Sequence, residues 1–190
     1  MDIGTSYGLA LSSGINAYLP LLAFAASARW LHLYKINPDF SYITQDWFMI
    51  ILAILALADL FADKIPGLDH VWDAIHTVLR PIAGALVAAA SGGPATDVHV
   101  PINLLAGGVL AGMVHTTKAT TRVASTTTTA GLLNIVISVV EDIVMVVGVI
   151  CSLFLPVVMV VAIVIFIAFF LFMAPRIARL LRRHRQKSYA

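Results

Sequence analysis

The chain has 190 residues, of which 60% are hydrophobic and only 12% are charged, and its mean hydropathy is +0.94. Soluble domains have roughly 45–50% apolar and about 25% charged residues, so this chain lacks the polar side chains that would cover a water-facing surface. Its single cysteine, Cys151, excludes a disulfide-rich secreted module, and its sparse charges exclude a nucleic-acid-binding domain. The composition therefore predicts an integral membrane protein that has membrane lipid, and not nucleic acid, as its partner.

Six predominantly apolar runs are candidates for the roughly 20 apolar residues that a helix needs to cross a bilayer. We therefore expect an all-α membrane protein with about six spanning helices in one transmembrane domain, residues 1–174, followed by a basic cytoplasmic tail, residues 175–190. The third run is short, so it either recruits residues 75–81 or forms a buried half-span. The runs, in chain order, are Tyr7–Trp30, Trp47–Phe61, Ile82–Ser91, Ile102–Val114, Leu132–Cys151 and Leu155–Met173.

The distribution of basic residues predicts the orientation of these runs. Of twelve lysines and arginines, only Arg29 and Lys35 fall on one side, and the side with the other ten is assigned to the cytoplasm. Six spans then place both termini in the cytoplasm. No basic segment precedes the first run, which favours a retained helix over a signal peptide, and the lack of an alternating-strand pattern favours the bacterial inner membrane.

Polar side chains interrupt several of the runs. Asn16 falls within the first run, where it either lines a cavity or hydrogen-bonds a neighbouring helix. Asp59 and Asp63 lie one helical turn apart at the end of the second run, and Glu141 and Asp142 are adjacent midway along the fifth. An ionisable group in a spanning helix costs roughly 2.5–3.5 kcal/mol, so such residues usually face a protein interior or a wet cavity. We interpret the carboxylates as a cation or proton relay; the alternatives are structural pairing with basic residues after the fourth run and a polar contact between copies.

A basic stripe follows the fourth run. His115, Lys118 and Arg122 recur at helical spacing and so share one face, from which they pair with the carboxylates of the second run or extend to lipid head groups. The hydroxyl-rich residues 116–129 around them have low helix propensity. We expect this segment to be either an unwound stretch that lines a path or a cytoplasmic loop.

Residues 68–80 have the pattern of an amphipathic helix, with apolar and polar residues on opposite faces. We expect this helix to lie in the cytoplasmic interface, with its tryptophan at the level of the lipid head groups. Two aspartates and a histidine share its polar face and suggest a divalent-metal site, although no recognised zinc spacing is present. The residues that mark this interfacial helix are Asp69, His70, Trp72, Asp73 and His76.

Small residues recur at four-residue spacing, which lets helices approach closely within one bundle or between copies. They favour a homo-oligomer. A faint match between residues 8–18 and 108–118, each with a polar break, also suggests an inverted repeat of three spans per half. The packing glycines are Gly4, Gly8, Gly84, Gly108 and Gly112.

Several motifs resemble one bacterial family. The string ADKIPGLDHVWDAIHT at residues 62–77, together with GINAY at 14–18, HTTKA at 115–119 and the Glu141-Asp142 pair, is similar to the integral-membrane family catalogued as domain of unknown function 4126. This resemblance implies an inner-membrane helical protein, a trimer, and a role in envelope upkeep in Gram-negative bacteria. It implies no activity, because the family has none assigned.

Three functions fit these features. The first is transport or conduction of a small ion or solute along a path lined by Glu141, Asp142, Asp59, Asp63 and Asn16. The second is a non-transporting scaffold that stabilises a complex of envelope proteins through its glycine faces and interfacial helix. The third, a membrane-embedded metal hydrolase, is weakened because no hydrolase or nucleotide-binding motif occurs, so we expect no enzyme and no cofactor.

Overall fold

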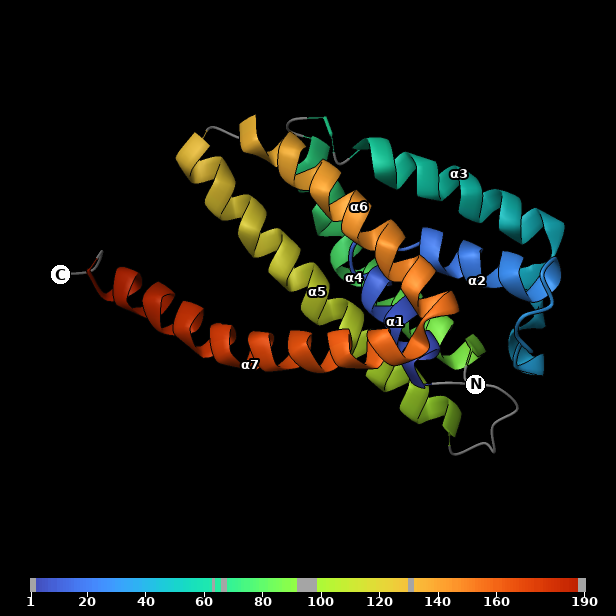
Figure 1. Cartoon of the computed structure of the whole chain (residues 1–190). Helices are drawn as coiled ribbons and strands as arrows, with labels where there is room; N and C mark the ends of the chain where they lie inside the picture. Colours follow the sequence, from blue (N-terminus) through green and yellow to red (C-terminus); the bar gives the residue numbers. More distant parts are fainter. Residues whose placement is uncertain (1–2, 63, 66–67, 92–98, 130–131, 188–190) are drawn as a thin grey trace.

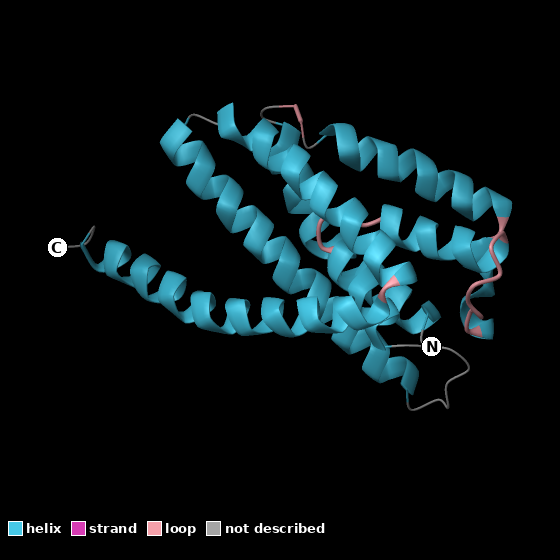
Figure 2. Cartoon of the chain, in the orientation of Figure 1, coloured by secondary structure: helices cyan, strands magenta, loops and turns pink. Residues whose placement is uncertain are grey.

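The structure, a computed structural model, describes residues 3–62, 64–65, 68–91, 99–129 and 132–187. All regular structure in these ranges is helical, without a strand, which confirms the all-α prediction (Figures 1 and 2). The helices are α1 (Ile3–Ser13), α2 (Leu19–Arg29), the 3₁₀ helix η1 (Pro38–Thr44), α3 (Asp46–Ala62), α4 (Leu68–Ser91), α5 (His99–Thr129), α6 (Leu132–Phe154) and α7 (Pro156–Lys187).

Four of these helices are long and apolar enough to cross a membrane. A fifth span is formed if η1 and α3, which meet at an angle of 65°, are counted together. The protein is therefore a multi-pass membrane protein with four or five spans among the described residues, instead of the six predicted. The four are Val71–Ser91, Val100–Val123, Leu133–Phe154 and Pro156–Met173.

The first apolar run does not cross as one helix, and its prediction as a span was wrong. It folds into two helices of 11 residues, α1 and α2, separated by residues 14–18. Near the start of α1, the Ser6 hydroxyl donates to the Ser91 carbonyl at the end of α4; after α2, the Asn37 amide donates to Ala90 beside it. The two outer ends thus lie at the same end of the bundle, so α1 and α2 form a re-entrant hairpin.

The residues at the break explain why the helix stops there. The side-chain Oδ1 of Asn16 accepts from the amides of Tyr18 and Leu19 at 3.0 and 2.9 Å, forming an Asx turn that competes with helical hydrogen bonding. Pro20 then occupies the first turn of α2, where its missing amide costs nothing. The sequence GINAYLP therefore ends one helix and begins the next.

Helix α4 corrects the prediction of an interfacial helix. Residues 68–80 continue without interruption into the third apolar run, so the amphipathic segment supplies the length that this run lacked. Asp73, His76 and Arg80 on its polar face are buried in the bundle, whereas Val71 and Val78 on its apolar face are exposed. This orientation is the inverse of that of a surface helix, as expected where hydrocarbon surrounds the protein.

Helix α5 corrects the prediction for the hydroxyl-rich segment, which is neither unwound nor a loop. It is helical through Thr129 because its threonines satisfy their hydroxyls locally: Thr116 donates to the Gly112 carbonyl at 2.8 Å and Thr120 donates to that of Thr116 at 2.7 Å. The break at Asn16 consequently has no counterpart at Thr116, and the proposed inverted repeat lacks this element.

The predicted packing glycines make their contacts within one chain. A Cβ atom on Gly4 would lie 1.9 Å from the carbonyl oxygen of Pro156 in α7, and one on Gly8 would lie 2.4 Å from Ser152 Oγ. A Cβ atom on Gly84 of α4 would lie 2.8 Å from the Gly107 carbonyl oxygen of α5. Gly108 and Gly112 have looser surroundings against Pro81, at 3.3 and 3.6 Å. Close helix approach therefore joins α1 to α6 and α7, and α4 to α5.

The hairpin divides the bundle into two halves. The half that contains it, here called the hairpin half, has an apolar core that includes Leu9, Phe24, Met49, Val87 and Val149. In the other half no hairpin fills the space between α3, α4, α5 and α6, and buried charged side chains lie there instead.

The start of α1 and the end of α7 lie at opposite ends of the bundle (Figure 1). α1 begins beside the start of α7, and α7 then runs as one helix to Lys187, so the predicted basic tail continues the last span (Figure 1). If η1–α3 and helices α4 to α7 each cross once, five crossings separate the two ends. The expectation of two cytoplasmic termini rested on six crossings and does not fit this arrangement.

Candidate functional site

The charged side chains of the second half, all buried except the partly exposed Glu141, form one connected group, here called the charged network. Four helices contribute to it: α3, α4, α5 and α6. Its side chains are Asp59, Asp73, His76, Arg80, His115, Lys118, Arg122 and Glu141.

Arg80 is the centre of this network. Its Nη2 lies 3.3 Å from Asp59 Oδ1, and its Nη1 lies 3.1 Å from Asp73 Oδ1 and 2.8 Å from His115 Nδ1. The side chains of Arg80 and Asp59 are 0% and 1% exposed. Since a buried guanidinium is tolerated only when its charge and donors are matched, the two carboxylates account for its position inside α4.

Arg122 connects this centre to α6. Its Nη1 lies 3.4 Å from Asp73 Oδ2 and its Nη2 lies 3.2 Å from Glu141 Oε2, while Lys118 Nζ approaches the same Glu141 oxygen at 3.5 Å. Acids and bases thus alternate from Asp59 to Lys118. Among the described side chains of this network, three carboxylates face three cations.

The hairpin tip is joined to the network through the two helix ends that meet there. The backbone amide of Ala17, before α2, donates to Asp59 Oδ2 at 3.3 Å, and Lys118 Nζ donates to the Ile15 carbonyl, after α1, at 3.2 Å. Asn16 Nδ2 donates to the Ala56 carbonyl of α3 at 3.3 Å. A carboxylate therefore faces the positive N-terminal end of one helix, and an ammonium faces the negative C-terminal end of the other.

Aromatic side chains surround Asp59. Trp72 Nε1 donates to Asp59 Oδ1 at 2.8 Å, and His76 Nε2 lies 3.7 Å from the same oxygen. The centroids of the Trp72 and His76 rings are 4.9 Å apart, and those of Tyr18 and His76 are 5.7 Å apart in a T-shaped arrangement. Trp72, predicted at the head-group level, thus donates instead to a buried carboxylate.

Asp142 stands apart from the network. It pairs with Lys64 at 2.5 Å, whereas Glu141 faces Arg122 and Lys118. The two adjacent acids therefore take different partners, as their roughly 100° separation around a helix predicts.

Some predicted site residues lie outside the described part of the chain, and the predicted metal site is not formed within that part. Asp63 lies outside the described residues, as do the side chains of Asp69 and His70. No group of three potential metal-ligating side chains occurs in the described part of the chain, and Asp73 is engaged by two arginines. Arg80 was not predicted as a site residue, although its position on the polar face of residues 68–80, one turn after His76, was a usable signal.

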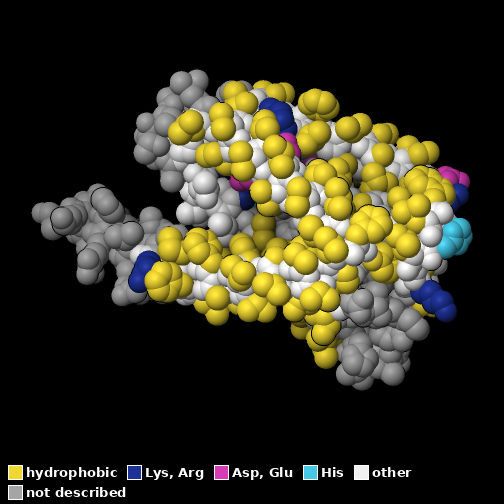
Figure 3. All heavy atoms as spheres, in the orientation of Figure 1, with side chains coloured by type: hydrophobic (Ala, Val, Ile, Leu, Met, Phe, Trp, Pro, Cys, Tyr) yellow, Lys and Arg dark blue, Asp and Glu magenta, His cyan; other side chains and the backbone are white. Residues whose placement is uncertain are grey.

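The outer surface contrasts with this interior. On the face shown in Figure 3, hydrophobic side chains cover most of the described surface over α3, α6 and α7. The exposed residues of α6 and α7 are chiefly Val, Ile, Leu and Phe. Such a surface suits hydrocarbon, so the charged network lies inside a protein whose exterior faces lipid.

Comparison with known proteins places the chain in a family but supplies no related activity. No curated protein and no solved structure matches it. A family model described as a domain of unknown function, DUF4126, matches residues 3–176, which include the hairpin and the whole charged network. The chain, an all-helical membrane protein with a charged interior, therefore belongs to the DUF4126 family.

Proposed function

We propose that this protein is a transporter that moves protons through the charged network, alone or coupled to a small solute. The observation that carries the proposal is the unbroken series of acids and bases from Asp59 to Glu141 within an apolar bundle. Ionisable groups within spanning helices are expensive and commonly mark ion or proton pathways.

A proton fits this network better than a metal cation. A metal ion binds through carboxylate oxygens that are free to coordinate it, and here arginine or lysine already faces Asp59, Asp73 and Glu141. A proton can instead be carried by the carboxyl and imidazole groups of the network, while its arginines keep their charge and hold these groups in place. His76 and His115 add imidazole rings, each of which has one proton-donating and one proton-accepting nitrogen when neutral, beside Asp59 and Arg80.

The hairpin is the element that would control passage. The apolar core around Leu9, Phe24 and Val87 closes the bundle between the network and the end where α1 begins. An open pore would need a polar lining along this half, so we favour a gated transporter in which α1 and α2 move. Discontinuous helices at a charged midpoint are typical of such transporters.

The setting of this transporter follows from the same features. We propose a bacterial inner-membrane location with the basic end of α7 in the cytoplasm, since this end carries most of the positive charge. The start of α1 then faces the opposite side. We also propose a homo-oligomer, with a trimer favoured by the family resemblance, and a role in envelope homeostasis.

Proton flux into proteoliposomes tests the proposal. A potassium gradient with valinomycin drives the flux, and a trapped pH-sensitive dye reports it. Wild type is compared with Glu141→Gln and Asp59→Asn, and with the control Asp46→Asn at an exposed pair outside the network. We expect both network variants to lose at least nine-tenths of the flux and the control to keep it.

The fold of each variant is checked by size-exclusion chromatography and thermal unfolding. Glu141 is the more informative site because its side chain is partly exposed and its loss leaves Arg122 with Asp73. Equal flux in wild type and folded Glu141→Gln would reject the proton pathway. A folded wild type without flux under any gradient of protons, sodium or potassium would favour the scaffold alternative, although the glycine faces invoked for it are used inside one chain.

A further inference from the structure

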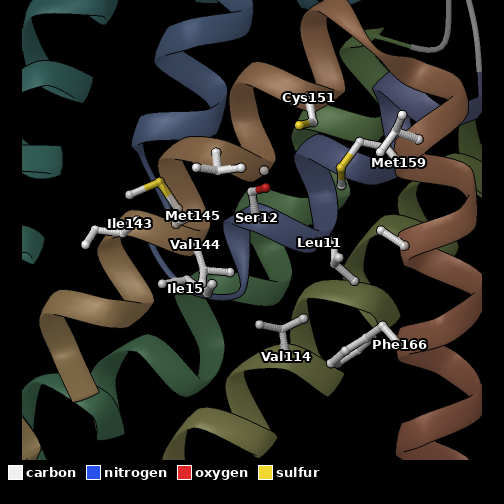
Figure 4. A pocket seen from close by; sticks show the side chains of 14 residues that line it. Leu11, Ser12, Ile15, Val114, Ile143, Val144, Met145, Cys151, Met159 and Phe166 are labelled. Atoms are coloured by element: carbon white, nitrogen blue, oxygen red, sulfur yellow. The ribbon is translucent and has the colours of Figure 1, made fainter. Parts of the chain in front are cut away.

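A second feature lies beside the hairpin, on the side away from Asp59. Helices α1, α5, α6 and α7 line a partly open cavity of about 450 Å³. Figure 4 shows Leu11 from α1, Val114 from α5 and Phe166 from α7 around the same opening. The hydroxyl of Ser12, the one hydroxyl in the lining, already donates to the Gly8 carbonyl at 3.0 Å.

The lining excludes water as a stable occupant. Water in a buried cavity needs two to four polar partners, and apart from Ser12 and the thiol of Cys151 the lining side chains are hydrocarbon or thioether. Met145 and Met159 form its inner wall and are 1% and 4% exposed. Methionine adapts its shape to irregular apolar ligands more readily than branched side chains do.

The mouth of the cavity faces the bilayer. Val144 of α6 and Val158 of α7 line it and are 56% and 52% exposed, so the opening lies between these two helices. Both helices are membrane spans by length and composition. An opening between two spanning helices faces the hydrocarbon of the membrane.

We propose that this cavity is a binding site for the hydrocarbon chain of a membrane lipid. Its volume falls within the roughly 300–1,000 Å³ of small-molecule sites. A helix from a second copy does not fit, because a helix 10–12 Å across would fill this volume with roughly one turn. A lipid chain is narrower, enters sideways from the bilayer and needs no hydrogen bonds.

A chain bound here rests against the hairpin. Ile15, whose carbonyl accepts from Lys118, is part of the cavity wall. Val114 lies one turn before Lys118 on α5, and Val144 lies one turn after Glu141 on α6. The site thus borders the charged network without including any of its side chains, and its existence does not depend on proton transport.

Photo-crosslinking tests the site. The protein is reconstituted in phosphatidylethanolamine and phosphatidylglycerol vesicles containing a phospholipid with a diazirine near the end of one acyl chain, and cross-linked peptides are mapped by mass spectrometry. We expect cross-links concentrated at residues 143–151 and 158–166. Ala162→Phe fills the cavity and should reduce them at least fivefold, whereas Val161→Phe, on the exposed side of α7, should not.

The single native cysteine gives a second measurement. Cys151 lines the cavity, so its alkylation by N-ethylmaleimide in delipidated protein should slow at least fivefold when phospholipid is restored. Cross-links spread evenly over all exposed helices and unchanged in Ala162→Phe would show ordinary surrounding lipid and overturn the proposal. Protection of Cys151 that follows the oligomeric fraction instead of lipid content would identify a second copy as the occupant and also overturn it.

Discussion

The hairpin half and the half that contains the charged network, here called the charged half, fill the space between the spanning helices in different ways. In the hairpin half, α1 and α2 place side chains such as Leu9 and Phe24 between the spanning helices. In the charged half the same helices have no central element, and paired charges from Asp59 to Glu141 occupy the interior. The hairpin half is therefore stabilised by close apolar packing, and the charged half by the pairing of opposite charges.

This difference has an energetic meaning in a membrane. Apolar contacts between spanning helices gain little from the hydrophobic effect, because lipid tails are as apolar as leucine, so the hairpin half depends on close packing. The charged half depends on complete pairing, since a buried charge that loses its partner keeps its full desolvation cost. The two halves should respond to different kinds of substitution.

The largest expected effect is in the charged half. Arg80→Met should lower the free energy of unfolding by about 3–5 kcal/mol, because it leaves Asp59 and Asp73 without their shared cation. The matched control is Arg29→Met, where a side chain 33% exposed pairs with an Asp46 that is 76% exposed, and about 1 kcal/mol or less is expected. Denaturant or thermal unfolding in detergent measures both. Similar losses in the two variants would show that charge pairing does not hold this half.

A smaller effect is expected from crowding the hairpin half. Gly107→Ala should cost about 1–3 kcal/mol, since the new Cβ would lie 2.4 Å from the Gly84 carbonyl oxygen and force α4 and α5 apart. Gly112→Ala on the same helix would meet only the Pro81 ring, at 3.6 Å, and should be nearly neutral. The same unfolding assay compares the two variants. Equal stability of Gly107→Ala and Gly112→Ala would show that close helix approach does not stabilise the hairpin half.

The smallest effect is expected at the boundary. Asn16→Ala removes the acceptor for the first amides of α2 and should cost about 1 kcal/mol, as loss of a helix-capping side chain usually does. Asn16→Ser keeps an uncharged side-chain oxygen that can accept from these amides and should recover part of this stability. A loss as large as that of Arg80→Met would instead place Asn16 energetically within the charged half.

The sequence predicted the composition of the site better than its placement. Pairing of Glu141 with Lys118 or Arg122 was one of the alternatives that the sequence left open, because charges inside apolar runs rarely face lipid. The polar face of residues 68–80 was assigned to water, since an amphipathic pattern alone does not say whether the polar face points outward or inward. Only the contacts of Asp73 with Arg80 and Arg122 decide that question.

The hairpin could not be predicted from hydropathy. Residues 7–30 are long and apolar enough for one span, and the break depends on a local turn at Asn16 and on partners in α3 and α5 that are distant in sequence. The prediction that the threonine-rich part of α5 is not helical was wrong for a related reason. Their propensity describes an exposed peptide, whereas in an apolar medium a threonine hydroxyl bonds to the preceding turn and the helix continues.

The position of α1 also constrains the order in which the fold can form. This helix precedes the other described helices in the chain, yet Gly4 packs against Pro156 and Ser6 against Ser91. Its neighbours therefore emerge from the ribosome long after it, and such non-local contacts close late. The two hairpin helices are each too short to span a membrane, and the tip between them is polar. During synthesis the hairpin therefore lacks its final contacts until the later helices are made. We therefore expect α1 to reach its final position only after α7 has been made, so biogenesis of this protein should depend on the last helix as much as on the first.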